Sequence, residues 1–148
     1  MGGLKEIAIL VADDNEFVRR AVCGVLRMDP DFRVICEAAS GMEAVDKAKE
    51  LQPHVVLLDV SMPQLSGFEA ARQILAALPQ VEIILLTEHA VAEMARAALD
   101  AGVRGYVIKS DAATELGDAV RAVMRKERYI SSALPVSFDQ PADPSLKA

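Results

Sequence analysis

The stretch HVVLLDVSMPQLSG, residues 54–67, decides the fold because an apolar run within it ends in a carboxylate. A short run of Val and Leu bounded by turn-forming residues is typical of a β-strand that is buried on both faces. An unpaired carboxylate is costly to bury in such a strand. We therefore expect Asp59 to lie at the mouth of the strand, beside a positive charge.

Four further apolar runs indicate that this strand is one of five. Helically spaced apolar residues follow the runs; Ser40 and Glu43 form a capping box for the second helix, and later helices begin near Ser66, Ala90 and Ala112. Strand-then-helix alternation, repeated five times, predicts an α/β fold with helices on both faces of a parallel sheet. The four further runs are IAILVA, FRVICEA, VEIILLT and GYVIK, at residues 7–12, 32–38, 81–87 and 105–109.

Length and composition fit one compact domain followed by a tail. The chain has 148 residues, of which 52% are hydrophobic and 26% are charged, enough to bury a substantial core. Beyond residue 130 the periodicity stops and Pro135, Pro141 and Pro144 follow. We expect a domain over residues 1–130 and a linker or flexible tail over residues 131–148.

Charge and hydropathy exclude several classes of function. A net charge of −6 and a pI near 4.9 argue against direct nucleic-acid binding, which needs clustered Lys and Arg. No apolar run is long enough to span a bilayer and the amino end lacks signal-peptide features, so we expect a cytoplasmic protein without a membrane partner. Cys23 and Cys36 lack metal-ligand or CxxC spacing and are expected to act as small buried hydrophobes.

Acidic residues gather where a doubly wound sheet binds its ligands. With strand order 2-1-3-4-5, the site lies beyond the carboxyl ends of strands 1 and 3, which carry Asp13, Asp14 and Asp59. Carboxylates this close repel one another unless a cation intervenes, and oxygen ligands in an open pocket suit Mg²⁺ or Mn²⁺. Alternatively, Asp13 or Asp14 caps the first helix, which explains one acid but poorly explains all three.

The two remaining strand ends add a hydroxyl and an ammonium to the same crevice. Strand 4 ends at Thr87 and strand 5 at Lys109. Taken alone, a Thr here is typical of a helix cap and a Lys of a solvated surface charge. Their value lies in their matching positions at the same edge of the sheet.

In combination, Asp13, Asp14, Asp59, Thr87 and Lys109 give the chain its family resemblance. Residues 5–128 resemble the receiver domain of bacterial two-component response regulators. The closing segment, GYVIKSDAATELGDAVRAVMRKERYISSAL, is similar to receivers of LuxR/NarL-type regulators. The resemblance implies a flavodoxin-like (βα)5 three-layer sandwich.

The resemblance also implies roles for individual residues. Asp59 would accept a phosphoryl group from a histidine kinase. Asp14, Asp59 and the backbone carbonyl of Ser61 would hold Mg²⁺, and Asp13 would act through a metal-bound water. Lys109 would neutralise charge on the transferred group, as phosphoryl transfer requires.

A switch is the second implication. Thr87 would move toward the phosphoryl oxygens and Tyr106 would change rotamer with it, altering the face formed by the fourth helix, fifth strand and fifth helix. We expect a signalling domain and no enzyme in the ordinary sense, although it would take part in its own phosphoryl transfer and hydrolysis. Phosphorylation is expected to favour a homodimer, and an attached or partner output would regulate transcription, touching DNA only through a further domain.

Two residues depart from the family pattern. Glu88 stands beside the switch hydroxyl where the family usually has a small residue, and it is expected to alter phosphoryl access or dephosphorylation. Ser110 stands where the family commonly has Pro after the lysine, which leaves the geometry of the Lys109–Ser110 bond open.

Two other functions are compatible with parts of the sequence. A Mg²⁺-dependent phosphatase with an aspartyl intermediate could use the same acids, but Ser61 stands where a second catalytic acid would be needed. A nucleotide-binding module on the same fold would need a glycine-rich phosphate loop, whereas the first strand runs into ADDNEFVRR.

Overall fold

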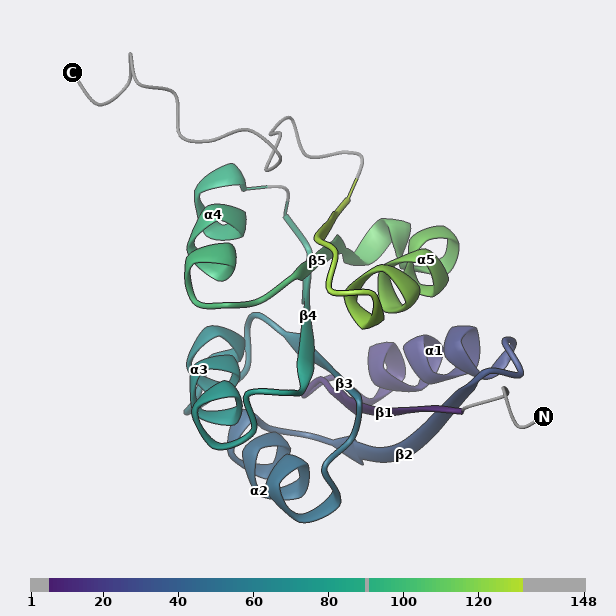
Figure 1. Cartoon of the computed structure of the whole chain (residues 1–148), viewed down its shortest axis with the longest axis horizontal. Coiled ribbons are helices and arrows are strands. Elements are labelled where there is room, and N and C mark those ends of the chain that lie inside the picture. Colours follow the sequence, from purple (N-terminus) through teal and green to yellow (C-terminus); the bar gives the residue numbers. More distant parts are fainter. Residues whose placement is uncertain (1–5, 90, 132–148) are drawn as a thin grey trace.

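The computed structural model describes residues 6–89 and 91–131, and these form one parallel six-stranded sheet. The strand order is β2-β1-β3-β4-β5-β6, so the predicted order 2-1-3-4-5 is confirmed and a sixth strand extends it (Figure 1). Residues 132–148 of the predicted tail lie outside the described residues. The strands are β1 Ile7–Ala12, β2 Phe32–Ala38, β3 Val55–Asp59, β4 Glu82–Thr87, β5 Gly105–Ile108 and β6 Tyr129–Ile130.

Helices cover both faces of the sheet, as expected for a doubly wound α/β fold. Two helices, α1 and α5, pack on one face, and α2, α3 and α4 pack on the other (Figure 1). None of them is both long and apolar enough to cross a membrane. The helices are α1 Glu16–Arg27, α2 Gly41–Leu51, α3 Gly67–Ala77, α4 Ala92–Asp100 and α5 Ala112–Met124, with a short 3₁₀ turn, η1 Lys109–Asp111, before α5.

The central strand β3 is apolar throughout because it serves two cores. Val55 and Leu57 belong to the apolar cluster under α1 and α5, whereas Val56 and Leu58 belong to the cluster under α2, α3 and α4. Successive side chains of a strand point to opposite faces, so a strand between two helical layers needs an apolar residue at every position. This explains the run that opens the decisive stretch.

The two cysteines are separated by the sheet. Cys23 is buried in the cluster under α1 and α5, and Cys36 packs against the opposite cluster. Burial raises the pKa of both thiols, to about 11 for Cys23, which disfavours the reactive thiolate. Both are free thiols with packing roles, in line with the prediction.

Side-chain caps start three of the helices. The side chains of Asn15, Ser40 and Ser66 each accept a hydrogen bond from a backbone N–H in the first turn of α1, α2 and α3. Glu43 Oε1 reaches back to the backbone N–H of Ala39 at 2.8 Å, so the predicted box closes one residue before the cap. Since Asn15 caps α1, neither Asp13 nor Asp14 is consumed by that role.

The short strand β6 was absent from the prediction. It follows α5 and pairs with β5 through Gly105 and Tyr106. Two half-buried residues are too short a run to show strand periodicity in a sequence. Next to it, Ser131 is only 1% exposed, which places it inside the folded unit although the sequence assigned it to the tail.

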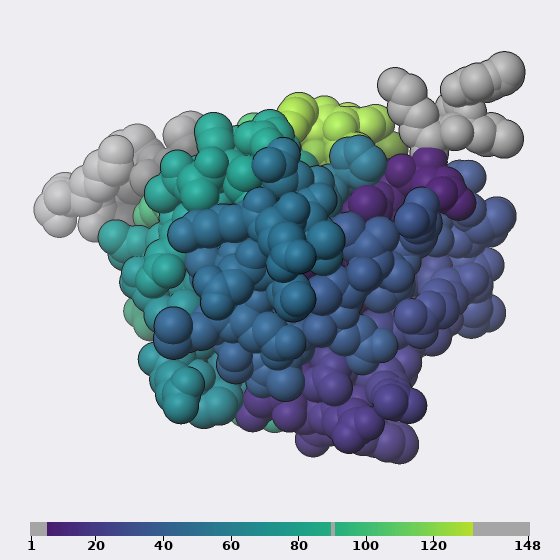
Figure 2. Space-filling model, turned by 90° about the horizontal axis from the view of Figure 1, so that it is seen from below, coloured from purple at the N-terminus to yellow at the C-terminus, as the bar shows by residue number. Residues whose placement is uncertain are grey.

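Helix α2 covers the lower side of the molecule in the helical layer on the second face (Figure 1). Figure 2 views the molecule from below Figure 1, and the blue atoms of the segment around α2 cover the middle of the visible face. Next along the layer, α3 contacts α2 directly. The polar candidate residues lie away from this layer, at the carboxyl ends of the strands.

Candidate functional site

The candidate site lies at the carboxyl ends of β1 and β3. These strands are neighbours, but the chain leaves β1 toward β2 on one side and β3 toward β4 on the other. The diverging loops leave a crevice, as at other switch points of doubly wound sheets. Its rim is fixed by the backbone N–H of Asp13, which donates to Ala38 O (3.0 Å), and that of Val60, which donates to Leu86 O (2.9 Å).

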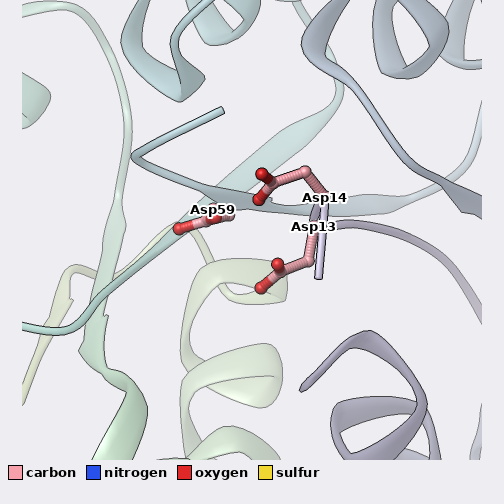
Figure 3. Close-up of side chains that lie close together, drawn as sticks. All are labelled: Asp13, Asp14 and Asp59. Carbon is pink, nitrogen blue, oxygen red and sulfur yellow. The ribbon is translucent and has the colours of Figure 1, made fainter. Parts of the chain in front are cut away.

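Three carboxylates meet in this crevice. Asp13 and Asp14 follow β1, Asp59 ends β3, and one oxygen of each lies within 4.8 Å of the others (Figure 3). Asp13 and Asp59 are buried, with 1% and 4% exposure, while Asp14 is exposed. The cluster is thus anchored in the protein and open to solvent on the Asp14 side.

A single ammonium faces the two buried acids. Lys109 Nζ lies 2.8 Å from Asp13 Oδ2 and 3.1 Å from Asp59 Oδ1. The lysine begins the η1 turn directly after β5, so its position depends on where β5 ends. Within the part of the chain that the structure describes, one ammonium is set against three carboxylates, so the cluster is short of positive charge.

The pKa of Asp59 reflects first its burial and then its acidic neighbour. Burial, followed by the neighbouring charge of Asp13, raises the pKa of Asp59 from 3.8 to about 6, although Lys109 acts in the opposite direction. For Lys109, burial alone would lower the pKa, but the hydrogen bond and charges of the two acids outweigh it and raise the pKa. The ammonium therefore stays charged, while Asp59 would be ionised more readily with a further cation beside it.

The donor set fits a hard divalent cation. Asp13 Oδ1 accepts from the backbone N–H of Asn15 (2.9 Å), and the buried Asp13 Oδ2 lies 2.8 Å from Lys109 Nζ. Three clustered carboxylates, one of them exposed, suit an ion that takes oxygen ligands and keeps several waters, as Mg²⁺ does. The cavity, of about 230 Å³, has room for the ion, its waters and a phosphoryl group.

The structure brings six of the seven predicted site residues to one cavity. Thr87 is buried at its edge, and its hydroxyl lies 3.3 Å from the backbone nitrogen and 3.2 Å from the backbone oxygen of His89. Tyr106 is the exception because it is fully buried in the cluster beneath α4, and burial raises the pKa of its hydroxyl. The six cavity residues are Asp13, Asp14, Asp59, Ser61, Thr87 and Lys109.

The two departures from the family pattern take different places. Glu88 is exposed and lines the cavity beside the acids. Ser110 lies in a neighbouring apolar groove between α1 and the start of α5, and its bond to Lys109 is trans. Of the two, only Glu88 can act directly on a group bound in the cavity.

Two supporting residues were missed by the sequence analysis. His89 lines the cavity, and its place two residues after the end of an apolar strand was a usable signal. Arg19 donates to the backbone oxygen of Asp13 (2.7 Å) and pairs with Glu37 (3.0 Å), which holds the β1–α1 loop in place. No spacing in the sequence predicts that an arginine near the start of a helix will contact the backbone of the preceding loop.

Comparison with known proteins agrees with this geometry. The profile of the response regulator receiver domain family matches residues 9–121. The chain is 40% identical over 121 residues to the response regulator protein VraR of Staphylococcus aureus, covering 82% of this chain and 58% of that protein. The chain thus spans little more than half the length of this relative.

Solved structures give the same result. A two-component response regulator of the LuxR family from Aurantimonas sp. SI85-9A1 superposes with a TM-score of 0.83 and 31% identity, covering 86% of this chain and 91% of that one. The response regulator domain of Thermotoga maritima CheB superposes with a TM-score of 0.77 and 30% identity, covering 82% and 98%. With its fold, its acidic crevice and these relatives in agreement, the chain belongs to the response regulator receiver domain family.

Proposed function

We propose that Asp59 accepts a phosphoryl group from a phosphohistidine of a partner histidine kinase, in a Mg²⁺-dependent reaction. The observation that carries the proposal is the shortage of positive charge around Asp59: among the described residues, three clustered carboxylates have one ammonium, that of Lys109, and it contacts two of them. A site built only for stability would pair its buried charges. This one is completed by a cation and by a group that the cation and Lys109 can bind together.

In the proposed metal site, Asp14, Asp59 and the backbone carbonyl of Ser61 hold Mg²⁺, and Asp13 acts through a water. When bound, the ion neutralises charge on the transferred phosphoryl group. Exposed Asp14 gives the ion a route from solvent. Mn²⁺ satisfies the same oxygen donors.

The transfer itself needs positioning more than covalent chemistry. A carboxylate oxygen of Asp59 forms a bond to phosphorus while the bond from phosphorus to the histidine nitrogen breaks. The electron pair of the broken bond stays on the imidazole nitrogen, and because the ring carries a proton on its other nitrogen before transfer, it leaves as neutral imidazole. Lys109 stabilises the charge that spreads over the equatorial oxygens, and hydrolysis by water would later return Asp59 to its free form.

The proposed switch begins at Thr87. Its hydroxyl contacts the backbone of His89, and donating to a phosphoryl oxygen would take it away from that contact. Tyr106, in the apolar cluster beneath α4, would then repack and alter the α4, β5 and α5 face. Shifting such a two-state equilibrium from 1:99 to 99:1 takes about 5.5 kcal/mol of differential stabilisation.

The proposed output is control of transcription by an attached or partner domain. The chain covers 58% of the length of VraR, which leaves room in such relatives for a further domain. Apolar surface on α1, including Phe17 at 84% exposure, borders a groove with the start of α5 and supports a homodimer formed on phosphorylation. Sedimentation of the phosphorylated protein tests this pairing, and a strict monomer contradicts it.

Phosphorylation by acetyl phosphate with Mg²⁺ tests the central proposal. We expect intact-protein mass spectrometry to show one added phosphoryl group on the wild type and none on Asp59→Asn or after chelation of the metal. Asp46→Asn, which changes an exposed acid on α2, is the matched control and should be labelled like the wild type. Equal labelling of Asp59→Asn contradicts the proposal, and steady turnover of a small phosphoester would favour a phosphatase.

A further inference from the structure

The hydroxyl of Ser131 ties the end of β5 to α5. Ser131 Oγ accepts a hydrogen bond from the backbone N–H of Ile108 (2.8 Å) and donates to Glu115 Oε1 (2.6 Å). Ser131 and Glu115 are both buried, and Glu115 lies in the first turn of α5. The three groups form a short chain of hydrogen bonds that runs from one helix to the last residue of a strand.

The direction of these hydrogen bonds is fixed by chemistry. A backbone N–H only donates, so Ser131 Oγ accepts from Ile108, and the one proton of the hydroxyl is left for Glu115 Oε1. Because Ser131 gives its proton to Glu115, a lone pair is left to face Ile108. The carboxylate therefore orients the hydroxyl toward the strand.

The strand end needs this contact because β6 is short. Pairing of β6 with β5 reaches only Gly105 and Tyr106, with Ser131 N donating to Tyr106 O at 2.9 Å. The N–H of Ile108 comes next, and the side chain of Ser131 takes the place that a longer strand would fill. Ile108 is also the cap of the η1 turn, which has no side-chain cap of its own.

Lys109 follows Ile108 directly. Its ammonium must stay 2.8 Å from Asp13 Oδ2 and 3.1 Å from Asp59 Oδ1 to serve the reaction proposed above. On one side β5 is held by its pairing with β4, which reaches Ile108 through Thr87. On the other side the Ser131 hydroxyl supplies the hold at Ile108.

We propose that Ser131, oriented by Glu115, is a positioning residue that holds the Lys109 ammonium in place for phosphoryl transfer. This inference rests on the proposed function. Ser131 touches neither the reacting atoms nor the cavity, and it acts only through the Ile108–Lys109 backbone. Small displacements of a charge-stabilising group have large effects on such reactions.

Three substitutions at one position test the role of the hydroxyl. We expect Ser131→Ala and Ser131→Val to slow labelling by acetyl phosphate about tenfold at saturating Mg²⁺, and Ser131→Thr, which has the shape of Val and keeps the hydroxyl, to stay near the wild-type rate. Ser40→Ala is the matched control because it removes a hydroxyl that also accepts from a backbone N–H, at the cap of α2. It should leave the rate unchanged.

Two further measurements separate positioning from general damage. Calorimetric titration should show that Ser131→Ala binds Mg²⁺ no more weakly than the wild type, because the carboxylates are untouched. In the unphosphorylated protein, Ser131→Ala should speed hydrogen exchange at the Ile108 amide and shift the side-chain NMR signals of Lys109, and Ser131→Thr should restore both. These signals report on the Ser131 contact even if Asp59 is never labelled, so failure of the proposed function is distinguishable.

Several outcomes overturn the inference. Labelling of Ser131→Ala at the wild-type rate, or equal rates for Ser131→Thr and Ser131→Val, shows that the hydroxyl does not matter. Unchanged Lys109 signals in Ser131→Ala show that the contact does not position the ammonium. Loss of Mg²⁺ binding together with labelling shows that the substitution damages the whole site.

Discussion

The two ends of β4 lie beside two buried acidic sites with opposite charge balance. At the amino end, Glu82 is 2% exposed and receives Arg104 Nη1 at 2.8 Å and Lys126 Nζ at 2.6 Å, so one carboxylate has two cations. At the carboxyl end, beside Thr87, the three acids of the candidate site have one ammonium among the described residues, that of Lys109, which contacts Asp13 and Asp59. The strand thus separates an acid that has two cationic partners from a cluster that has too few. We call the Glu82 end of β4 the saturated end and the end beside Asp13, Asp14 and Asp59 the unsaturated end.

This difference distinguishes structural from functional burial of charge. A buried carboxylate with two cationic partners has its charge compensated within the protein and gains little from a further cation. In a cluster with too few cationic partners, burial and the neighbouring acids raise the pKa of a carboxyl group, and the cluster gains stability from any cation that binds. Such raised pKa values are common at functional sites. Removal of one charge at a time from each end of β4 should therefore affect stability and phosphorylation differently at the two ends.

Removal of a lysine from each end should give the largest difference in stability and labelling between the two ends. Without Mg²⁺ at about pH 8, we expect Lys109→Met to lower the free energy of unfolding by about 3 kcal/mol because two buried acids lose their partner. Labelling by acetyl phosphate should fall about 100-fold. Urea unfolding and mass spectrometry measure the two effects.

The matched change at the other end is Lys126→Met. Glu82 keeps Arg104, and the Lys126 side chain is 57% exposed, so the loss should be less than about 1 kcal/mol, with normal labelling. Mg²⁺ should restore part of the stability of Lys109→Met and none of that of Lys126→Met. Equal losses for the two variants would contradict the proposed difference between the ends.

Removal of the acid at the unsaturated end should stabilise the protein. The pKa of Asp59 is about 6 in the folded chain against 3.8 as its ordinary value, so the folded state binds this proton more tightly. Stability from this group is therefore lost as pH rises from about 4 to about 6, and by about pH 8 the loss approaches 3 kcal/mol. We expect Asp59→Asn, without Mg²⁺, to be more stable than the wild type by about 2 kcal/mol at about pH 8.

The pH profile identifies the source of that gain. The difference between Asp59→Asn and the wild type should shrink as pH falls through 6 and vanish below about pH 3, where Asp59 is protonated in both the folded and the unfolded states. Urea unfolding across this range measures it. A difference that grows on acidification would show that the amide stabilises the fold for another reason.

The matching acid-to-amide substitution at the saturated end should change the free energy of unfolding in the opposite direction. Glu82→Gln removes the charge that Arg104 and Lys126 share, and we expect a loss of about 1 kcal/mol. The loss is moderate because both cations are partly exposed and can turn toward water. Unfolding with and without Mg²⁺ should give the same loss, and a gain in stability would remove the contrast between the ends.

The sequence predicts the unsaturated end better than the saturated one. Asp13, Asp14 and Asp59 follow apolar strands whose order and direction are set by the rules of parallel sheets, so their meeting could be deduced. Glu82 begins an equally apolar strand, but its partners lie 22 and 44 residues further on, in segments that carry no pattern linking them to it. Long-range pairing of single side chains has no period in the sequence.

The same reasoning explains the errors at the end of the chain. The strand β6 is only two residues long, and a pair of residues cannot show alternation. The sequence predicts a tail that includes Ser131 because prolines follow it, but the Ser131 hydroxyl accepts a hydrogen bond from the backbone N–H at the end of β5. A polar residue that repairs a strand end is recognised only when the geometry of both strands is known.

The smallest expected effect concerns an exposed acid at the unsaturated end. Glu88 adds negative charge to the rim of a cavity that must admit an anionic phosphoryl donor. Because its side chain is exposed, its repulsion is weakened by water and salt. We expect Glu88→Gln, which keeps the shape and removes the charge, to be labelled by acetyl phosphate about two to three times faster than the wild type at low ionic strength.

Salt dependence separates this electrostatic effect from a steric one. At about 1 M salt the screening length falls to about 3 Å, so the advantage of Glu88→Gln should disappear. Glu93→Gln, at an exposed acid in the first turn of α4, is the control and should match the wild type at both salt concentrations. Faster labelling of Glu88→Gln that persists in high salt would mean that Glu88 limits access by its size. The charge of Glu88 would then not contribute to the shortage of positive charge at this end of the sheet.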